Sequence, residues 1–171
     1  MPVEVYAHPE VRLQKARIRE MTPDDLPQVM RIEFAVFDQP WSPQAFALEL
    51  SSNPSALYLV LEDIKADSPA IIGYIGLWQT QDKVWITRIA VDPSHMRQGW
   101  GSCLLRQAQA QAENWGLKSI ALEVRESNSR ACAFYLSEGY EQVEILYDYY
   151  SLPQENARVF MKRLDNPLES D

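Results

Sequence analysis

The residues between Ile89 and Leu105 have the types and spacing that bind an anion. An apolar run that ends at Val91 is followed by Gly99-Trp100-Gly101, and a helical pattern begins directly afterwards. The N–H groups of such a turn converge near the positive end of the helix dipole, where phosphate binds. Glycine lets the backbone approach the anion, and Arg97 adds a positive charge beside it. A lone Gly-x-Gly motif also occurs in ordinary strand–turn–helix connections, where the glycines serve geometry alone.

A carboxylate follows in the run Ser119–Val124, which has the composition of a strand. Alternation places Glu123 on the face opposite its apolar neighbours. Partial burial there would raise the pKa of Glu123 from about 4.3 toward neutrality, which suits a general base. The alternative is a structural role, either at a sheet edge or in an ion pair with an arginine such as Arg88 or Arg125.

An amide and a phenol come next, at the start and in the middle of the predicted helix Ser129–Glu138. Asn128 suits the cap of that helix, or its amide could turn toward a ligand. Tyr135 suits core packing, or its phenol could donate a proton at the mouth of a cleft. Each residue alone is compatible with a purely structural role.

Hydrophobic periodicity predicts the elements that position these residues. Strand patterns occur at seven places: Ala16–Glu20, Ala56–Glu62, Ile71–Thr80, Val84–Val91, Ser119–Val124, Tyr140–Tyr147 and Ala157–Leu164. A loop that contains Pro153 would separate the last two.

Four helices are expected between these strands. Two begin after the N-cap residues Thr22 and Ser42, and the others span Gly101–Trp115 and Ser129–Glu138. The apolar stripes of the first two helices would be Leu26, Val29, Met30 and Phe34, and Phe46, Ala47 and Leu50. The order of elements predicts one α/β (α+β) domain with helices packed on a mixed sheet.

Composition argues against several classes of protein. The net charge of −8 disfavours a broad nucleic-acid surface and suits a cationic partner, or serves solubility alone. Cys103 and Cys132 have no second ligand at metal-binding spacing, so we expect free thiols and no metal site. Neither a signal peptide nor a membrane span is recognisable, which predicts a cytoplasmic protein without a membrane partner. Residues 1–14 would form an N-terminal extension, 15–164 the domain and 165–171 a C-terminal tail.

Taken together, three separated segments resemble the motifs of the GCN5-related N-acetyltransferase (GNAT) superfamily in both order and spacing: Ile89–Leu105, Leu122–Asn128 and Ala133–Tyr140. The resemblance extends from about Ala16 to Leu164. Within the superfamily, the chain is most similar to the bacterial ribosomal-protein-alanine N-acetyltransferases, through Pro40-Trp41-Ser42 and the pair Tyr149-Tyr150.

The resemblance implies a fold and a cofactor site. The fold would be a mixed, mostly antiparallel sheet of six to seven strands, with helices on both faces and a splayed strand pair that holds acetyl-CoA. Ile89, Ala90 and Val91 would pair their backbone with the pantetheine arm, Asn128 would hydrogen-bond the same arm, and Tyr135 would lie beside the sulfur. The pyrophosphate would be bound by Arg97, Gln98, Gly99, Trp100, Gly101 and Ser102. Because Met96 stands where the family has Gln or Arg, Arg97 would supply the cation.

The implied reaction is direct attack of an amine on acetyl-CoA, without a metal. Glu123 would take the proton of the amine and Tyr135 would protonate the leaving thiolate. The acceptor would be a protein or peptide N-terminus, such as that of a ribosomal protein, framed by Trp41, Tyr149 and Tyr150, and the enzyme would be a monomer or weak dimer. Two alternatives remain: an acetyltransferase for a small amine, and a non-catalytic acyl-CoA-binding module.

Overall fold

The computed structural model describes residues 16–65 and 68–164. The expected extension (1–14) and tail (165–171) lie outside the described residues. The predicted order of strands and helices is confirmed over the described part of the chain. The elements are β1 (Ala16–Glu20), α1 (Leu26–Val36), α2 (Pro43–Ser52), β2 (Ala56–Asp63), β3 (Ala70–Gln79), β4 (Val84–Val91), α3 (Trp100–Asn114), β5 (Ser119–Arg125), α4 (Ser129–Ser137), β6 (Glu141–Ser151) and β7 (Gln154–Arg163), with 3-10 turns at Pro23–Asp25 and Pro93–His95.

The strands form one seven-stranded mixed sheet in the order β1-β2-β3-β4-β5-β7-β6. Neighbouring strands are antiparallel except β4 and β5, which are parallel. That parallel pair joins the N-terminal meander to the C-terminal three strands. The expectation of six to seven strands in a mixed, mostly antiparallel sheet is therefore confirmed.

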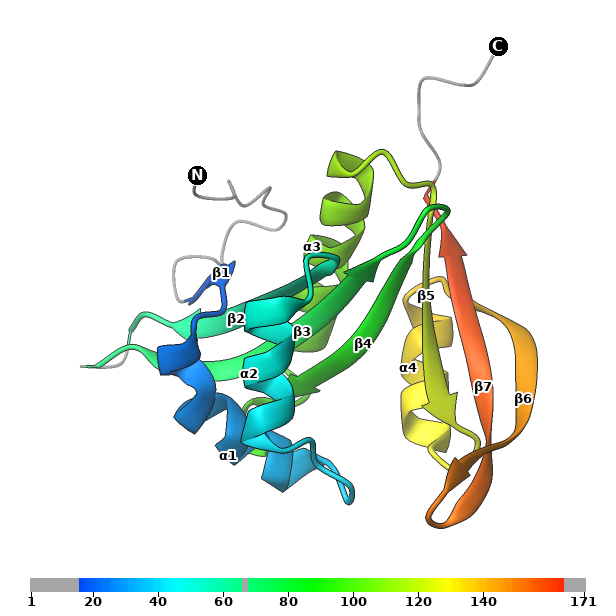
Figure 1. The fold of residues 1–171 in the computed structure, drawn as a ribbon, viewed down its shortest axis with the longest axis horizontal. Coiled ribbons are helices and arrows are strands. Elements are labelled where there is room, and N and C mark those ends of the chain that lie inside the picture. The colour runs from blue at the N-terminus through cyan, green and yellow to red at the C-terminus, as the bar shows by residue number, and fades with distance from the viewer. Residues whose placement is uncertain (1–15, 66–67, 165–171) are drawn as a thin grey trace.

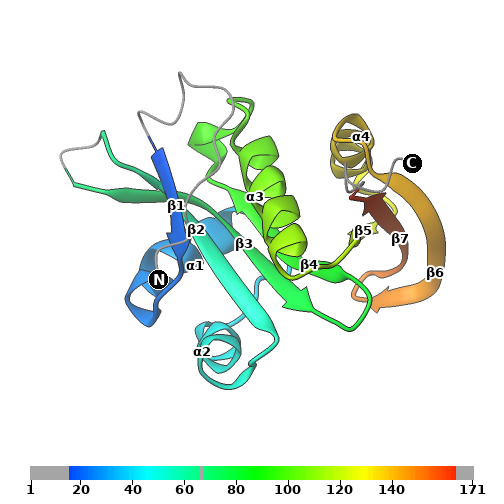
Figure 2. The ribbon, with the colours of Figure 1, turned by 90° about the horizontal axis from the view of Figure 1, so that it is seen from above.

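Helices cover both faces of the sheet, with α1 and α2 on one side and α3 and α4 on the other (Figures 1 and 2). Each face has its own core. Phe46, Tyr58 and Tyr74 are the large buried side chains on the α1/α2 face. Leu104, Ala108 and Phe160 belong to the core on the α3/α4 face.

Local signals set most helix ends where they were predicted. Ser42 caps α2, since its Oγ accepts from the N–H of Ala45 at 3.1 Å. Asn128 caps α4 in the same way, with Oδ1 accepting from the N–H of Ala131 at 3.1 Å. Gly139 adopts a φ of 83° directly after α4, a conformation that glycine adopts without strain.

Two predicted core positions are wrong. Phe34 on α1 is 61% exposed, whereas the neighbouring Glu33 is fully buried. Ala47 on α2 is exposed, so that helix contributes chiefly Phe46 to the core. The buried face of α1 therefore includes residue 33 in place of residue 34. Burial of Glu33 is possible because Arg88 pairs with its carboxylate inside the protein.

The predicted loop around Pro153 is also shorter than expected. Strands β6 and β7 pair as far as Ser151 and Gln154, which leaves a two-residue turn. The register of β6 shifts between Leu146 and Tyr150, so residues 147–149 bulge out of the ladder. Pro153 fits in the turn because it has no ladder hydrogen bond to donate there. The interruption of the β6–β7 pairing lies in the bulge and not at the proline.

No helix among residues 16–65 and 68–164 has the length and apolar character needed to cross a bilayer.

An ion-pair cluster fixes β1 to the beginning of the first helical segment. The guanidinium of Arg19 donates to both oxygens of Asp25, at 2.7 and 2.8 Å, and to Glu62 on β2 at 3.0 Å. The N–H of Thr22 also donates to Asp25. The hydrogen bonds from Arg19 hold the pKa of the Asp25 carboxyl below its usual range. The folded state therefore favours the ionised form of Asp25.

Replacement of Asp25 by Asn should destabilise the protein by about 1–3 kcal/mol at pH 7, because the buried acceptor loses its charge. A lowered folded-state pKa contributes stability above the unfolded pKa of about 3.9 and loses it as pH falls through the folded value. The difference between wild type and Asp25→Asn should therefore shrink below pH 4 in urea unfolding curves. The exposed neighbour provides the control, Asp24→Asn; equal stability of the two variants at pH 7 would contradict the role of Asp25.

Candidate functional site

Strands β4 and β5 separate after a short parallel pairing. Their register includes only Val84, Ile86 and the residue between them, opposite Ile120–Leu122. From Thr87 onward, β4 keeps its ladder with β3 but has no register with β5. Figure 1 shows the two strands meeting near one end and diverging toward the other. This is the splayed pair that the family resemblance implied.

A β-bulge lies at the point of separation. Gly76 pairs with Arg88 and Leu77 with Ile86, so Thr87 is the extra residue of β4. Thr87 and Arg88 consequently both face the α1/α2 side, where they contact Tyr58 and Glu33 respectively. Gly76 leaves room for this arrangement, because a Cβ there would lie 2.3 Å from the Tyr58 ring.

The predicted acid and base lie on opposite faces of the sheet. Ile120, Leu122 and Val124 of β5 pack in the core beneath α3 and α4, so Glu123 projects to the α1/α2 face. Tyr135 of α4 belongs to the core on the α3/α4 face.

Glu123 is held by a tyrosine and not by an arginine. The hydroxyl of Tyr149 donates to Oε2 of Glu123 at 2.7 Å. Tyr149 comes from the bulge of β6 and reaches across β7 to β5. Partial burial, together with this bond and the negative charge of Glu123, raises the pKa of Tyr149 to about 12. The alternative ion pairs of Glu123 are not formed, since Arg88 bonds Glu33 and Arg125 bonds Glu155.

Tyr135 is packed among aromatic rings. Its ring centroid lies 5.3 Å from that of Phe134, 5.9 Å from Tyr140 and 6.1 Å from Phe160. Burial raises the pKa of Tyr135 well above its usual value, so the phenol keeps its proton at neutral pH.

The other aromatic candidates lie on the α1/α2 face. The rings of Tyr149 and Tyr150 are 5.1 Å apart and nearly perpendicular, and the Arg125 guanidinium lies 4.0 Å from the Tyr150 centroid. Trp41 precedes α2, and Arg88 lies 5.3 Å from its ring. Tyr150 is within electrostatic range of both Glu123 and Arg88, which raise and lower its pKa respectively after the larger effect of burial. Tyr150 is thus near charges on both separated strands, and Tyr149 bonds β5.

The turn before α3 has the backbone of an anion site. Arg97 and Gly99 adopt left-handed φ values of 58° and 81°. The helix begins with Cys103 donating to Gly99, so the N–H groups of Trp100, Gly101 and Ser102 have no acceptor within the helix. Arg97 is exposed, whereas Met96 packs against the core. The Met96 side chain, which replaces the Gln or Arg of the family pattern, therefore anchors the turn in the core. The exposed Arg97 guanidinium is the positive charge next to it.

Three residues in or near this turn also serve packing or internal hydrogen bonds. A Cβ on Gly101 would lie 3.1 Å from the Phe134 ring, so this glycine also lets α4 pack on α3. The hydroxyl of Ser102 donates to Glu138, so the backbone N–H is the donor of Ser102 that is left for an anion. Asn128 likewise uses Oδ1 for its cap.

A buried acid that the sequence analysis missed organises the α1/α2 face. Glu33 is fully buried and accepts from Nε of Arg88 at 3.0 Å, from the N–H of Trp41 at 2.7 Å and from the hydroxyl of Tyr74. The signal was available, because residue 33 continues the 26, 29, 30 stripe of α1. The acid joins helix α1, strands β3 and β4, and the segment that holds Trp41.

No group of three or more potential metal ligands is arranged to hold an ion within the described residues.

Comparison with known proteins agrees with this geometry. The sequence model described as "Acetyltransferase (GNAT) family" matches residues 26–140. The ribosomal protein bS18-alanine N-acetyltransferase of Escherichia coli K12 is 33% identical over 133 residues, which are 78% of this chain and 86% of that protein. The crystal structure of the ribosomal-protein-S18-alanine N-acetyltransferase from Escherichia coli superimposes with a TM-score of 0.77 at 28% identity and covers 91% of this chain and 98% of that one. Arabidopsis thaliana NAA60, solved with acetyl-CoA, shares the fold at a TM-score of 0.78 and 14% identity, over 88% of this chain and 99% of that one.

The importance of the buried acid can be tested by Glu33→Gln. Removing one partner of a buried ion pair leaves Arg88 uncompensated and should cost about 3–5 kcal/mol of unfolding free energy. Urea denaturation at pH 7 measures the effect. The matched control is Glu113→Gln, since Glu113 is exposed on α3; a loss of less than about 1 kcal/mol for Glu33→Gln would contradict the proposed organisation.

Proposed function

The chain belongs to the GNAT family and transfers an acetyl group from acetyl-CoA to an amine, and we propose that its acceptor is the N-terminal α-amine of a protein. The observation that supports this acceptor most directly is the identity of 33% to an enzyme whose name specifies the alanine of ribosomal protein bS18. An α-amine also suits the chemistry, because its pKa of about 7.7–8.0 leaves a larger neutral fraction at pH 7 than the pKa of about 10.4 of a lysine.

The turn before α3 fits the pyrophosphate of acetyl-CoA. The N–H groups of Trp100, Gly101 and Ser102 have no acceptor within the helix and are donors at its N-terminus. We assign the remaining contacts to the backbone of Gln98 and Gly99 and to the side chain of Arg97. Binding through N–H groups does not require the Gln or Arg that Met96 replaces.

The open edge of β4 fits the pantetheine arm. Ile89, Ala90 and Val91 pair with β3 on one side only, and β5 has moved away on the other. Their backbone groups on that side need partners, which an amide-containing arm supplies. Asn128 would bond the same arm through Nδ2, since its Oδ1 is used by the cap.

Glu123 is the proposed general base. Its Oε2 already accepts from Tyr149, so Oε1 is the oxygen left, among the described residues, to take a proton from the amine or from a water. The position of Glu123 on the α1/α2 face lets the acceptor approach from the side opposite Tyr135. Trp41, Tyr149 and Tyr150 on that face would frame the acceptor peptide.

Bound acetyl-CoA supplies a thioester that the amine attacks. A backbone N–H of Ile89–Val91 would stabilise the negative charge that develops on the carbonyl oxygen. Tyr135 holds a phenolic proton at neutral pH, because burial raises its pKa, and would donate it to the departing sulfur. No covalent enzyme intermediate is required, and so neither Cys103 nor Cys132 has a role in this scheme.

A panel of acceptors tests the proposed function through release of CoA. A peptide with the N-terminal sequence of bS18 should be acetylated faster than spermidine, an aminoglycoside or free alanine, and the same peptide with a blocked N-terminus should be inert. Faster reaction of a small amine would replace the proposed acceptor. Binding of CoA with no transfer to any member of the panel would indicate a binding module instead of an enzyme for these amines.

The catalytic assignment predicts that Glu123→Gln and Tyr135→Phe each lower kcat by roughly 10²-fold or more, because each removes a proton-transfer group. The KM for acetyl-CoA should change much less. Exposed residues of β6 provide matched controls, Glu144→Gln and Tyr147→Phe. Wild-type turnover in either test variant would remove that residue from the mechanism.

A further inference from the structure

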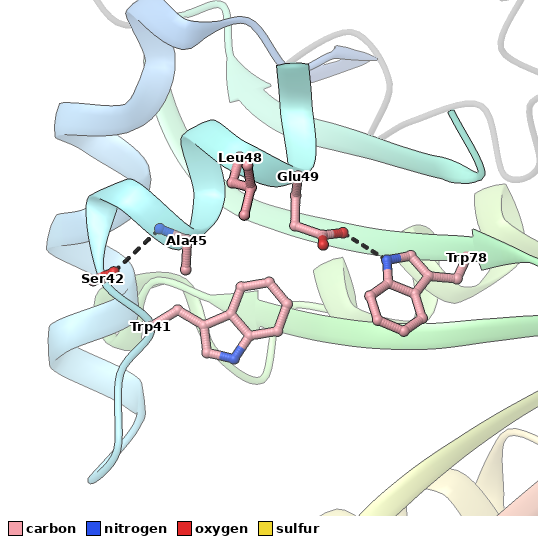
Figure 3. Close-up of a pocket in the computed structure, with 6 residues that line it drawn as sticks. All are labelled: Trp41, Ser42, Ala45, Leu48, Glu49 and Trp78. Carbon is pink, nitrogen blue, oxygen red and sulfur yellow. Dashed lines mark hydrogen bonds between the residues drawn. The ribbon is translucent and has the colours of Figure 1, made fainter. Parts of the chain in front are cut away.

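A pocket of about 440 Å³ lies on the α1/α2 face, beside the beginning of α2 and the end of β3. Figure 3 shows the Glu49 carboxylate between two indole rings. We call this site the indole pocket and define it by its lining residues: Trp41, Ser42, Ala45, Leu48, Glu49 and Trp78. Of these six residues, only Trp41 has a place in the reaction proposed above, where it frames the acceptor peptide.

The carboxylate of Glu49 is held through one oxygen only. Its Oε2 accepts from Nε1 of Trp78 at 2.7 Å, from Nδ2 of Asn53 at 3.1 Å and from the hydroxyl of Tyr58 at 3.4 Å. Oε1 has no hydrogen-bond partner in the described part of the chain. Three donors therefore fix the orientation of the carboxylate while one oxygen stays available to a ligand.

The lining favours a cationic side chain with an apolar stem. Indole faces attract a cation and also pack against methylene groups, and a carboxylate oxygen completes the coordination of an ammonium or guanidinium. An anion would find the Trp78 N–H already donated to Glu49. No basic residue is part of the lining. The net charge of −8 favours a basic ligand as well.

The pocket is connected to the separated strands. The Tyr58 hydroxyl lies 3.4 Å from Glu49 and also 3.4 Å from Thr87, the bulged residue at which β4 leaves β5. Trp41 belongs to the pocket and is 5.3 Å from Arg88 of β4. The indole pocket thus borders the face toward which Glu123 projects.

We propose that the indole pocket binds a lysine or arginine side chain in the first few residues of the acceptor peptide and thereby selects basic N-termini. The inference rests on the proposed protein acceptor and specifies its substrate class. Trp78 of the pocket pairs with Trp85 of β4, and Trp85 pairs with Ala121, which lies two residues before Glu123 on β5. Two strand spacings of about 4.8 Å and two residues along β5 are a separation that a few extended peptide residues span at about 3.3–3.6 Å each.

The test uses peptides that begin with alanine and have a single arginine at position 2, 3, 4 or 5, each paired with the uncharged citrulline counterpart. For the wild-type protein, one arginine position should give a kcat/KM about tenfold above its citrulline counterpart, mainly through KM. In Glu49→Gln, whose amide oxygen can still accept from Trp78, that ratio should fall to about one. The exposed control variant, Glu113→Gln, should keep the wild-type ratio.

A second variant guards against misfolding of Glu49→Gln. Leu48 is 63% exposed at the pocket, so Leu48→Lys should fold and should repel a basic side chain, which lowers the same ratio. Equal rates for arginine and citrulline at every position in the wild type, or an unchanged ratio in both variants, would overturn the indole-pocket assignment while peptide acetylation stands. Acetylation of small amines with no acetylation of any peptide would instead overturn the acceptor on which it rests.

Discussion

The short parallel pairing of β4 and β5 is the constraint on which the site depends. The two strands share a register only from Val84 to Ile86, and the bulge at Thr87 marks its end. Beyond that point β4 has an unpaired edge inside the sheet, whose backbone groups require partners. An open internal edge is a liability in a folded protein unless a ligand satisfies it, and a peptide-like cofactor arm can do so. The core on the α3/α4 face continues across both strands, since it contains Ile86 of β4 and Leu122 of β5.

The buried Glu33 stabilises one wall of that opening. Burying a carboxylate is costly unless charge and hydrogen bonds compensate it, and here Arg88, Tyr74 and the N–H of Trp41 do so. The same bonds fix the bulged strand and the segment before α2 relative to each other. Trp41, which lines the indole pocket, thereby has a defined position beside β4.

The two faces of the opening differ in chemistry. On the α3/α4 face, the N–H groups at the start of α3 have no acceptor within the helix, and burial raises the pKa of Tyr135 so that it keeps its proton. On the α1/α2 face, Glu123 and Glu49 each accept hydrogen bonds from aromatic side chains and each retain one carboxylate oxygen for a ligand, among the residues described. In the proposed arrangement, the anionic cofactor and a basic acceptor would approach from opposite sides and would not compete for one surface.

The sequence by itself determined the order of elements, the caps at Ser42 and Asn128, the turn before α3 and the face of β5 on which Glu123 lies. These features follow from periodicity and from interactions within a few residues, which one segment contains in full. Only the tertiary structure decided which partners compensate the buried charge of Glu33, and that Tyr149 bonds Glu123 across 26 residues of chain. It also showed that Gly101 accommodates Phe134, and that Glu49 meets Trp78. Such contacts join distant segments, and their energies depend on bulges, registers and packing that no local pattern encodes.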